Sequence, residues 1–370
     1  MNEKTIIIGG GIAGLLTAIQ LQTQDIPCLV IEKKRYPFHR VCGEYISNEA
    51  KPFLKKLDLF PTSVVPTEIS RFQLSSVRGK STTMPLDLGG FGVSRFAFDN
   101  FLYERAVACG VEFLFEEVNS ITFEDHQFTV ISTTHKVYSK IVVAAFGKRS
   151  LLDMKLERSF IQKRSPFVGV KYHIRTDHDA DLIALHNFDG GYCGISNVEN
   201  GVTNLCYLAS AKKLKESGDI KTLEQNVLYT NPLLKSIFMN ADFLFHKPEV
   251  IGEISFETKS PVEGHIIMVG DAAGMITPLC GNGMAMAIHS SKIAVGWISA
   301  FWHSAIDRAT MENSYSREWN HNFKTRLRTG RQVQQLLFGT PFASEMAAGL
   351  ISNIRPLRNF IMRQTHGVPF

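Results

Sequence analysis

Apolar and polar positions divide the chain into two kinds of segment. The first kind is short, almost wholly apolar and rich in β-branched residues; it occurs at residues 5–8, 27–31, 111–115, 140–145 and 265–271. Such continuous runs are typical of strands that are buried on both faces of a parallel sheet. Apolar residues at helical spacing follow the first run at once. These segments therefore predict an α/β domain.

The second kind of segment alternates apolar and polar residues and is separated by turn sequences such as Asp-Gly-Gly and Glu-Asn-Gly. This pattern predicts the strands of an antiparallel sheet, and therefore a second domain. The strands are expected at residues 69–84 (a pair turning near 78–80), 166–174, 182–188, 191–198, 202–208 and 249–257. Helices are expected at residues 48–57, 95–109, 219–238 and 283–302.

Three glycines directly follow the first apolar run. Gly9, Gly11 and Gly14 form a Gly-x-Gly-x-x-Gly motif, with Ala13 inside it. Gly9 allows a tight turn out of the strand, Gly11 lets a pyrophosphate approach the backbone, and Gly14 lets the helix pack close to the strand. The helix start offers free N–H groups and a positive dipole end to phosphates. The spacing predicts a dinucleotide site; the alternative is a glycine-rich turn without a ligand.

An acidic residue at the end of the second apolar run supports the dinucleotide site. Glu32 lies 18 residues beyond Gly14. This is close to the spacing of ~20 residues at which a carboxylate meets ribose hydroxyls. Because a carboxylate favours a free 2′-hydroxyl, FAD or NAD is expected here rather than NADP.

A second glycine-containing stretch follows the last apolar run, where Asp271 comes directly after a predicted strand. An Asp at a strand end can hold a chain of sugar-like hydroxyls. N–H groups at a helix start can face the N1–C2=O edge of a reduced flavin, which carries negative charge. The residues expected near the cofactor at this helix start are Gly281, Asn282, Gly283 and Met284. One FAD molecule would then be held at its adenosine end by the first motif and at its flavin end by the second.

Composition places the chain among ordinary globular proteins. Its 370 residues are 44% hydrophobic and 20% charged, which predicts about two domains. Six cysteines form no Cys-x-x-Cys pair, so a reducing cytoplasm is expected and no metal site is predicted. The apolar stretch 283–302 contains His289 and Lys292, and a buried helix is therefore expected there rather than a membrane span.

The net charge of +5 is concentrated at one end of the chain. From Arg317 onward, eight Lys/Arg and two Asp/Glu give a net +6, so the rest of the chain is close to neutral. No aromatic-rich basic module accompanies this charge, and no nucleic-acid partner is expected. The basic region is either the solvated face of helices or a weak contact for an anionic membrane, which would make a cytoplasmic protein peripheral to the membrane.

Taken together, these motifs resemble the FAD-binding core of class A flavoprotein monooxygenases. The resemblance covers roughly residues 1–300 and rests on the glycine motif with Glu32, on Arg95 at a predicted helix start, on Ala145-Phe146-Gly147-x-x-Ser150 and on Gly270-Asp271-Ala272-Ala273. The family includes aromatic hydroxylases, and its fold is shared by geranylgeranyl reductases and flavin-dependent halogenases.

The resemblance implies a Rossmann-type FAD-binding domain, an inserted antiparallel-sheet substrate domain and a C-terminal helical region. These are expected at residues 1–65, 95–160 and 258–303 for FAD, at 66–94 and 161–257 for the substrate, and at 304–370 for the helices. The resemblance also implies phosphate contact from Arg95, ribityl contact from Asp271 and a phosphate or ribose contact from Arg40. The other expected cofactor contacts are Lys33, Val118 and Gly147.

Departures from the family pattern bear on the reaction. Phe146 replaces the Asp of an Asp-Gly turn, so NADPH handling by the usual route is in question. The Trp-x-Trp-x-Ile-Pro signature of halogenases is absent, and residues 192–196 lack the Trp and Pro of the prenyl-reductase signature. Val41-Cys42-Gly43-Glu44, however, resembles the Cys-Gly turn of those reductases. The chain looks most similar to bacterial FAD-dependent oxidoreductases associated with polyketide-derived phenolic lipids.

Oxygen transfer to an electron-rich ring is the reaction that this pattern favours. Reduced FAD would react with O2 to give a C4a-hydroperoxide, with NADPH or NADH as the electron donor and a hydrophobic or aromatic small molecule as the substrate. A phenol needs a base or hydrogen-bond acceptor. The candidate catalytic residues are His173, His186 and Tyr192 on the predicted sheet, with Cys42 and Glu44 in the loop near the flavin. Each of them has a structural role as its alternative.

Two other functions stay open. One is a reductase that transfers a hydride from FADH2 to a geranylgeranyl-type or other alkene, which the Cys42-Gly43 turn and the missing Asp-Gly support. The other is a non-catalytic module that holds flavin and binds a lipid or a partner through its basic tail.

Overall fold

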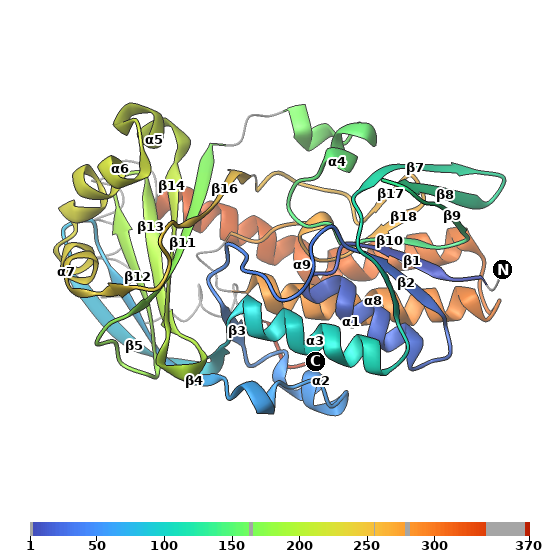
Figure 1. Cartoon of the computed structure of the whole chain (residues 1–370), viewed down its shortest axis with the longest axis horizontal. Helices are drawn as coiled ribbons and strands as arrows, with labels where there is room; N and C mark the ends of the chain where they lie inside the picture. Colours follow the sequence, from blue (N-terminus) through green and yellow to red (C-terminus); the bar gives the residue numbers. More distant parts are fainter. Residues whose placement is uncertain (1–2, 163–165, 255, 278–281, 338–366) are drawn as a thin grey trace.

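The computed structural model describes residues 3–162, 166–254, 256–277, 282–337 and 367–370. Its two large sheets lie side by side along the long axis of the molecule, and the helix α9 (Arg308–Leu337) extends from one half toward the other (Figure 1). The continuous apolar runs and the alternating runs of the sequence form separate sheets, one parallel and one antiparallel in character.

The six-stranded sheet carries the glycine motif. Its order is β17-β18-β10-β1-β2-β6, and all neighbours are parallel except β17 and β18. The strands are Thr5–Ile8 (β1), Cys28–Ile31 (β2), Glu112–Leu114 (β6), Val142–Ala144 (β10), Val262–Glu263 (β17) and Ile266–Met268 (β18). Strands β1, β10 and β18 are buried along their whole length, as their apolar runs predict.

Helices α1 (Ile12–Gln22), α3 (Arg95–Ala108) and α8 (Gly283–Trp302) pack together on this sheet, and α8 also packs against α9. Helix α8 coincides with the buried helix expected at residues 283–302. In the part of the chain that the structure describes, no helix is both long and apolar enough to cross a bilayer. This half also contains α4 (Leu151–Lys155) and a three-stranded antiparallel sheet of β7 (Val118–Glu124), β8 (Gln127–Ser132) and β9 (Lys136–Ser139).

The nine-stranded sheet forms the other half of the molecule. Its order is β15-β11-β14-β13-β12-β4-β5-β3, with β16 paired to β11, and the pairing is antiparallel except between β4 and β12. The strands are Tyr45–Ser47 (β3), Thr67–Ser75 (β4), Ser81–Gly92 (β5), Phe167–Arg175 (β11), Leu182–Phe188 (β12), Gly191–Asn197 (β13), Thr203–Ser210 (β14), Asp242–Phe243 (β15) and Glu249–Ile254 (β16). Its outer face packs against α5 (Ala211–Ser217), α6 (Ile220–Asn226) and α7 (Pro232–Asn240), and its inner face looks toward the other half (Figure 1).

Two expected helices differ from the observed ones. The helix expected over residues 219–238 is interrupted, because the Asn231 side chain caps a new helix that begins with Pro232. The helix expected over residues 48–57 is the shorter α2 (Lys51–Lys56), since residues 48–50 form a turn after β3 in which Asn48 donates hydrogen bonds to the carbonyls of Gly89 and Leu88. Single 3-10 turns occur at Thr62–Val64, Ser159–Gln162, Glu199–Gly201, Leu228–Thr230 and Gly270–Ala272.

Part of the basic C-terminal region is used inside the fold. Arg326 lies 2.9 Å from the buried carboxylate of Glu49, and Arg331 donates a hydrogen bond to the carbonyl of Phe256. The other arginines of this region include some between residues 338 and 366, which lie outside the described residues. The expected contact with an anionic membrane therefore stays a prediction.

The close approach of β1, α1 and β10 depends on two glycines. Gly9 has a φ of +103°, and a Cβ added there would lie 2.4 Å from the carbonyl oxygen of Ala145. A Cβ added to Gly14 would lie 2.0 Å from the carbonyl oxygen of Gly9. Both distances are far inside van der Waals contact, so a side chain at either position would push the backbone segments apart.

Replacing Gly14 with alanine tests this packing. Gly14→Ala is expected to lower the free energy of unfolding by about 1–3 kcal/mol, because α1 must move away from Gly9. The matched control is Gly296→Ala, at an exposed position of α8 where an added Cβ meets nothing within 4 Å. The free energy of unfolding of that control should rise by up to ~1 kcal/mol, because alanine has a higher helix propensity than glycine. Urea unfolding measures both variants, and equal stabilities would contradict the packing argument.

Candidate active site

A cavity of about 1020 Å³ lies between the two halves of the molecule. The glycine motif and the end of β2 line one part of it, and the inner face of the nine-stranded sheet lines another. The expected site residues that line it are Gly9, Gly11, Ala13, Glu32, Lys33, Arg40, Cys42, Glu44, Arg95, Val118, Gly147, Tyr192, Asp271, Gly283 and Met284. Gly14, Asn282 and His186 are not among the lining residues, and Gly281 lies outside the described part of the chain.

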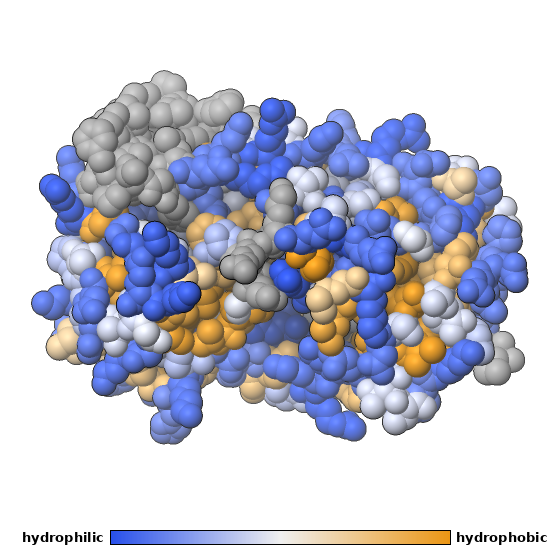
Figure 2. Space-filling view, turned by 90° about the horizontal axis from the view of Figure 1, so that it is seen from above, coloured by the Kyte–Doolittle hydropathy of each residue, from blue (hydrophilic) through white to orange (hydrophobic). Residues whose placement is uncertain are grey.

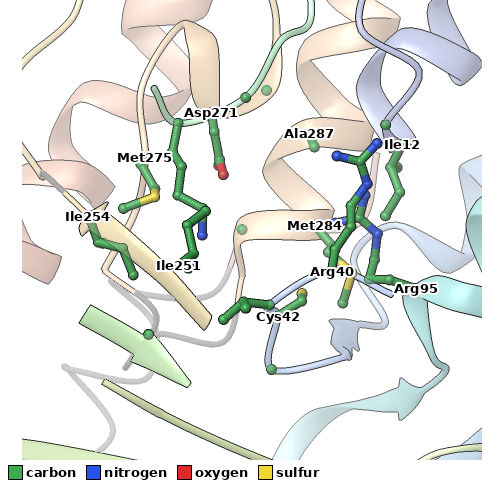
Figure 3. A pocket seen from close by; sticks show the side chains of 18 of the residues that line it. Ile12, Arg40, Cys42, Arg95, Ile251, Ile254, Asp271, Met275, Met284 and Ala287 are labelled. Atoms are coloured by element: carbon green, nitrogen blue, oxygen red, sulfur yellow. The ribbon is translucent and has the colours of Figure 1, made fainter. Parts of the chain in front are cut away.

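The glycine motif and two arginines form a part of the cavity that fits a pyrophosphate. A Cβ added to Gly11 would meet only a guanidinium nitrogen of Arg95, 3.5 Å away, so the backbone is open to the cavity. Arg95 donates two hydrogen bonds of 2.7 Å to Asp99, and Arg40 lies 3.3 Å from the same carboxylate. Figure 3 shows both guanidinium groups close to Ile12, the first residue of α1. Fixed guanidinium groups beside a helix N-terminus suit phosphate oxygens.

Glu32 is almost completely buried at the end of β2. Its carboxylate accepts hydrogen bonds from the backbone N–H groups of Gly10 (2.8 Å) and Lys34 (3.0 Å) and from Arg40 (3.1 Å). Because a carboxylate has about four acceptor positions, about one remains for a ribose hydroxyl. This orientation fits the adenosine ribose of a dinucleotide.

The opposite part of the polar lining fits the flavin end of FAD. Asp271 follows β18, and its side chain projects into the cavity (Figure 3). On the neighbouring loop, Gly147 has a φ of +88° and open space where a Cβ would be. Gly283 and Met284 line the cavity at the start of α8. The lining thus reaches from the Glu32 carboxylate to a second helix N-terminus, an arrangement that fits an extended FAD molecule.

The nine-stranded sheet gives the cavity an apolar wall. Leu74, Leu185, Tyr192 and Leu208 belong to one buried cluster with Met275, and all five line the cavity. They come from β4, β12, β13 and β14 and from the loop after β18. The inner face of the sheet therefore offers mainly aliphatic surface to whatever lies beside the flavin-end residues.

Some of the exposed residues that line the cavity are apolar, beside exposed charged ones such as Lys33 and Glu117. Leu151 and Met154 of α4 and Val250 of β16 line the cavity and are 56%, 48% and 47% exposed. Figure 2 shows apolar surface near the middle of this face of the molecule. An apolar ligand would therefore meet matching surface at the entrance as well as inside.

His186 does not face the cavity. Successive residues of a strand point to opposite faces, and Leu185 occupies the inner face of β12. The Nδ1 of His186 lies 2.9 Å from Ser75 Oγ, which also accepts a hydrogen bond from Asn231 at the start of α7. Burial lowers the pKa of His186 to about 4. A neutral imidazole behind the wall does not reach a substrate, so this position does not support the expected catalytic role.

Glu44 is completely buried where the cavity meets β11. Its Oε1 accepts hydrogen bonds from Lys171 (2.5 Å) and from the Arg95 N–H (2.7 Å), and its Oε2 lies 2.7 Å from His173 Nε2. Burial alone would raise the pKa of Glu44, but the Lys171 ammonium and His173 outweigh it and lower the pKa. Because both of its oxygens are occupied, Glu44 anchors its loop to β11. The Nε2 of His173 is occupied by the same contact and is not available as a base for a substrate.

The anchored loop presents Cys42 to the cavity. The carbonyl of Cys42 accepts a hydrogen bond from Asn204 of β14 (3.2 Å). Its Sγ lies 3.5 Å from the N–H of Glu44 and is also a hydrogen-bond partner of Arg95. Figure 3 shows Cys42 between the arginines and the side chains of β16. The thiol is therefore fixed at the boundary between the polar and the apolar lining.

Two buried lysines at the site were not identified from the sequence. Lys171 is fully buried. It is a single Lys or Arg within the predicted strand 166–174, and this could have indicated a buried ion pair because a buried charge requires a partner. Lys259 donates hydrogen bonds to the backbone carbonyls of Lys148 and Asp271, and no pattern around it distinguishes it from a surface lysine. In the described ranges, no group of three or more His, Cys, Asp or Glu is placed to hold a metal ion.

Removing the cation from the buried pair tests the anchoring role of Glu44. Lys171→Met is expected to lower the free energy of unfolding by about 3–5 kcal/mol, because it leaves the Glu44 carboxylate buried without its cation. The matched control is Lys51→Met, since the Lys51–Glu68 pair has the same 2.5 Å separation at the surface. The control should lose less than about 1 kcal/mol in urea unfolding. Similar decreases of the free energy of unfolding in both variants would show that the buried pair contributes no more to stability than the surface pair.

Known proteins resemble this chain in sequence. Residues 7–46 match the NAD(P)-binding Rossmann-like domain family. The chain is 25% identical over 371 residues to digeranylgeranylglycerophospholipid reductase 2 of Methanopyrus kandleri, which covers 94% of this chain and 88% of that protein.

Solved structures share the whole fold. The flavin-dependent brominase Bmp2 matches 98% of this chain and 93% of its own with a TM-score of 0.80 at 18% identity. Halogenase PltM, in a complex with phloroglucinol and FAD, matches 100% of this chain and 87% of its own with a TM-score of 0.75 at 16% identity. The chain therefore has the fold of these flavin-dependent halogenases and is similar over most of its length to a digeranylgeranylglycerophospholipid reductase.

Proposed function

We propose that this protein is an FAD-dependent reductase that saturates carbon–carbon double bonds of an apolar, isoprenoid-type substrate, with NADPH or NADH as the electron donor. The observation that carries the proposal is the aliphatic inner face of the nine-stranded sheet, opposite the residues that fit the flavin end of FAD. The similarity to a digeranylgeranylglycerophospholipid reductase supports the same choice. The sequence pattern favoured phenol hydroxylation, and the orientation of the polar side chains changes that preference.

The apolar wall suits an alkene chain better than a phenol. Leu74, Leu185 and Leu208 offer no hydrogen-bond partner, so a hydroxyl group placed against them would lose its water without replacement. A hydrocarbon chain has no such penalty and gains about 25 cal/mol for each Å² that it buries. The half-exposed Leu151 and Val250 extend this favourable surface to the entrance.

Two of the three sheet residues expected to activate a phenol, His173 and His186, are not among the residues that line the cavity. His186 lies on the outer face of β12, and His173 is held by Glu44. Burial raises the pKa of Cys206, which does line the cavity, to about 12, so its thiol is not a base at neutral pH. These three groups therefore give little support to base-assisted oxygen transfer.

Saturation of one double bond consumes a hydride and a proton. Bound FAD, once reduced by the nicotinamide, would supply the hydride to one carbon. The other carbon takes a proton, and Cys42 is the candidate donor because its thiol is fixed in the cavity at the edge of the apolar lining. Water at the polar side would return the proton to the thiol. The apolar wall would orient the chain and keep water away from the double bond.

Tyr192 favours a second candidate, hydroxylation of an aromatic substrate. It is buried in the wall and lines the cavity, and it brings a phenolic hydroxyl beside Leu74, Leu185 and Leu208. A hydroxyl at this point would orient a phenol through a hydrogen bond. In that case the product would contain oxygen from O2.

Incubation of the FAD-loaded protein with NADPH or NADH and a geranylgeranyl lipid, with and without oxygen, separates the candidates. We expect the lipid to gain two hydrogens per double bond under strictly anaerobic conditions, measured by mass spectrometry, because the reaction needs only hydride and proton. Product that forms only in air and gains an oxygen atom would instead establish the hydroxylase. Bound FAD that neither nicotinamide reduces would favour the non-catalytic module.

Removing the thiol tests the proton donor. Cys42→Ala is expected to lower kcat by about 10²–10³-fold, because the second carbon loses its positioned acid. Affinity for FAD, measured by flavin fluorescence, should change little. The matched control is Cys109→Ala, at the end of α3 and not among the residues that line the cavity. Equal kcat values for the two variants would exclude Cys42 as the donor.

A further inference from the structure

The two loops at the flavin end of the cavity share a buried ammonium group. Lys259 lies between β16 and β17 and is 7% exposed. Its Nζ donates hydrogen bonds to the carbonyl oxygens of Lys148 (2.6 Å) and Asp271 (2.8 Å), and it lies 4.4 Å from the centre of the Phe160 ring. The two carbonyls belong to the loops after β10 and β18, which are adjacent parallel strands. One side chain therefore links both loops behind the cavity wall.

No carboxylate in the described part of the chain is hydrogen-bonded to the Lys259 ammonium. Both oxygens of the buried Asp153 are already used, and one of them accepts a 2.8 Å hydrogen bond from Arg158. Arg158 also donates to the carbonyl of Ala272, one residue beyond Asp271. Arg158 lies between two carboxylates, Asp153 at 2.8 Å and the partly exposed Glu263 at 3.7 Å, whereas the Lys259 ammonium is hydrogen-bonded to carbonyl oxygens. A positive charge at Lys259 therefore lies directly behind the two loops that line the cavity.

The ammonium is charged under ordinary conditions. Burial lowers the pKa of Lys259 to about 8, with Arg158 and Lys148 acting in the same direction and Asp153 and Asp271 acting against it. Most of the molecules therefore carry the charge at pH 7. A neutral hydrogen-bond donor would be enough to link the two carbonyls. Burying a charged ammonium is costly, so the positive charge of Lys259 requires a reason beyond this link.

We propose that Lys259 raises the reduction potential of bound FAD by stabilising the reduced, anionic flavin. The inference rests on the proposed function, because it requires FAD with its flavin end beside Asp271. Two-electron reduction by a nicotinamide adds a hydride to the flavin and leaves a negative charge at its N1–C2=O edge, whereas the oxidised ring is neutral. A fixed positive charge in a site that excludes water favours the charged form. Lys259 is a positioning residue in this role, since it acts through the field and through the two loops.

The reduction potential of bound FAD is the direct measurement. Lys259→Met removes the charge at similar length, and Lys259→Arg keeps the charge. At pH 7, under anaerobic equilibration with a reference dye, the Met variant is expected to bind reduced FAD at least tenfold more weakly relative to oxidised FAD. This fold-change corresponds to a potential about 30 mV lower. The Arg variant should stay close to the wild type.

The control is Lys155→Met. Lys155 also donates a hydrogen bond to a backbone carbonyl, that of Asn119 at 2.6 Å, but it does so at the exposed surface of α4. Its loss should leave the potential unchanged. Should the Met variant fail to fold, Lys259→Gln offers a neutral side chain that can still donate to a carbonyl, and the same shift is expected of it.

The outcomes separate three cases. A lower potential in the neutral variants with an unchanged Arg variant supports the proposal. Equal weakening of oxidised and reduced FAD, with no change in potential, shows that Lys259 only links the loops and overturns the proposal. A wild-type protein that binds no FAD would overturn the proposed function itself, which is a different result from an unshifted potential.

Discussion

Backbone contact at Gly9 and Gly14 is the constraint on which the rest of the structure depends. Without Cβ atoms at these positions, β1, α1 and β10 approach one another closely enough for the first turn of α1 to open onto the cavity. The same close packing places the loop after β10 beside the loop after β18, because both strands run parallel to β1 in one sheet. Parallel strands bring their carboxyl ends to one edge, so Glu32, Gly147 and Asp271 meet there although they are far apart in the chain.

A second constraint joins this edge to the nine-stranded sheet. The carboxylate of Glu44 binds Lys171 and His173 of β11 and the N–H of Arg95, which begins α3. These contacts hold the loop before β3 against both halves of the molecule. Glu44 also has a φ of +53°, which is uncommon for a residue other than glycine and is maintained here by buried contacts. This anchoring and the hydrogen bond from Asn204 to the carbonyl of Cys42 together fix the position of Cys42.

The sequence predicts the features that depend on local pattern, and misses those that depend on distant partners. The apolar runs, the glycine motif and the alternating strands each identify an element, because burial has a period that the sequence displays. The partner of Glu44 is 127 residues away in Lys171, and no local pattern connects them. Alternation likewise predicts that Leu185 and His186 point to opposite faces of β12, but it does not say which face meets the cavity. The hydrogen bonds of Lys259 are made to backbone carbonyls, which leave no trace in the sequence.

The register of β12 shows how one fold can serve different reactions. Proteins similar to this chain in structure include halogenases, and the similar sequence named above is a reductase, so the fold alone does not determine the reaction. Here the inner position of β12 holds Leu185, while the imidazole of the next residue lies behind the wall with Ser75. A shift of one residue would exchange them and place a titratable group against the substrate. Pairing of β12 with β13 and with β4 prevents that shift, so Leu185 rather than His186 faces the cavity.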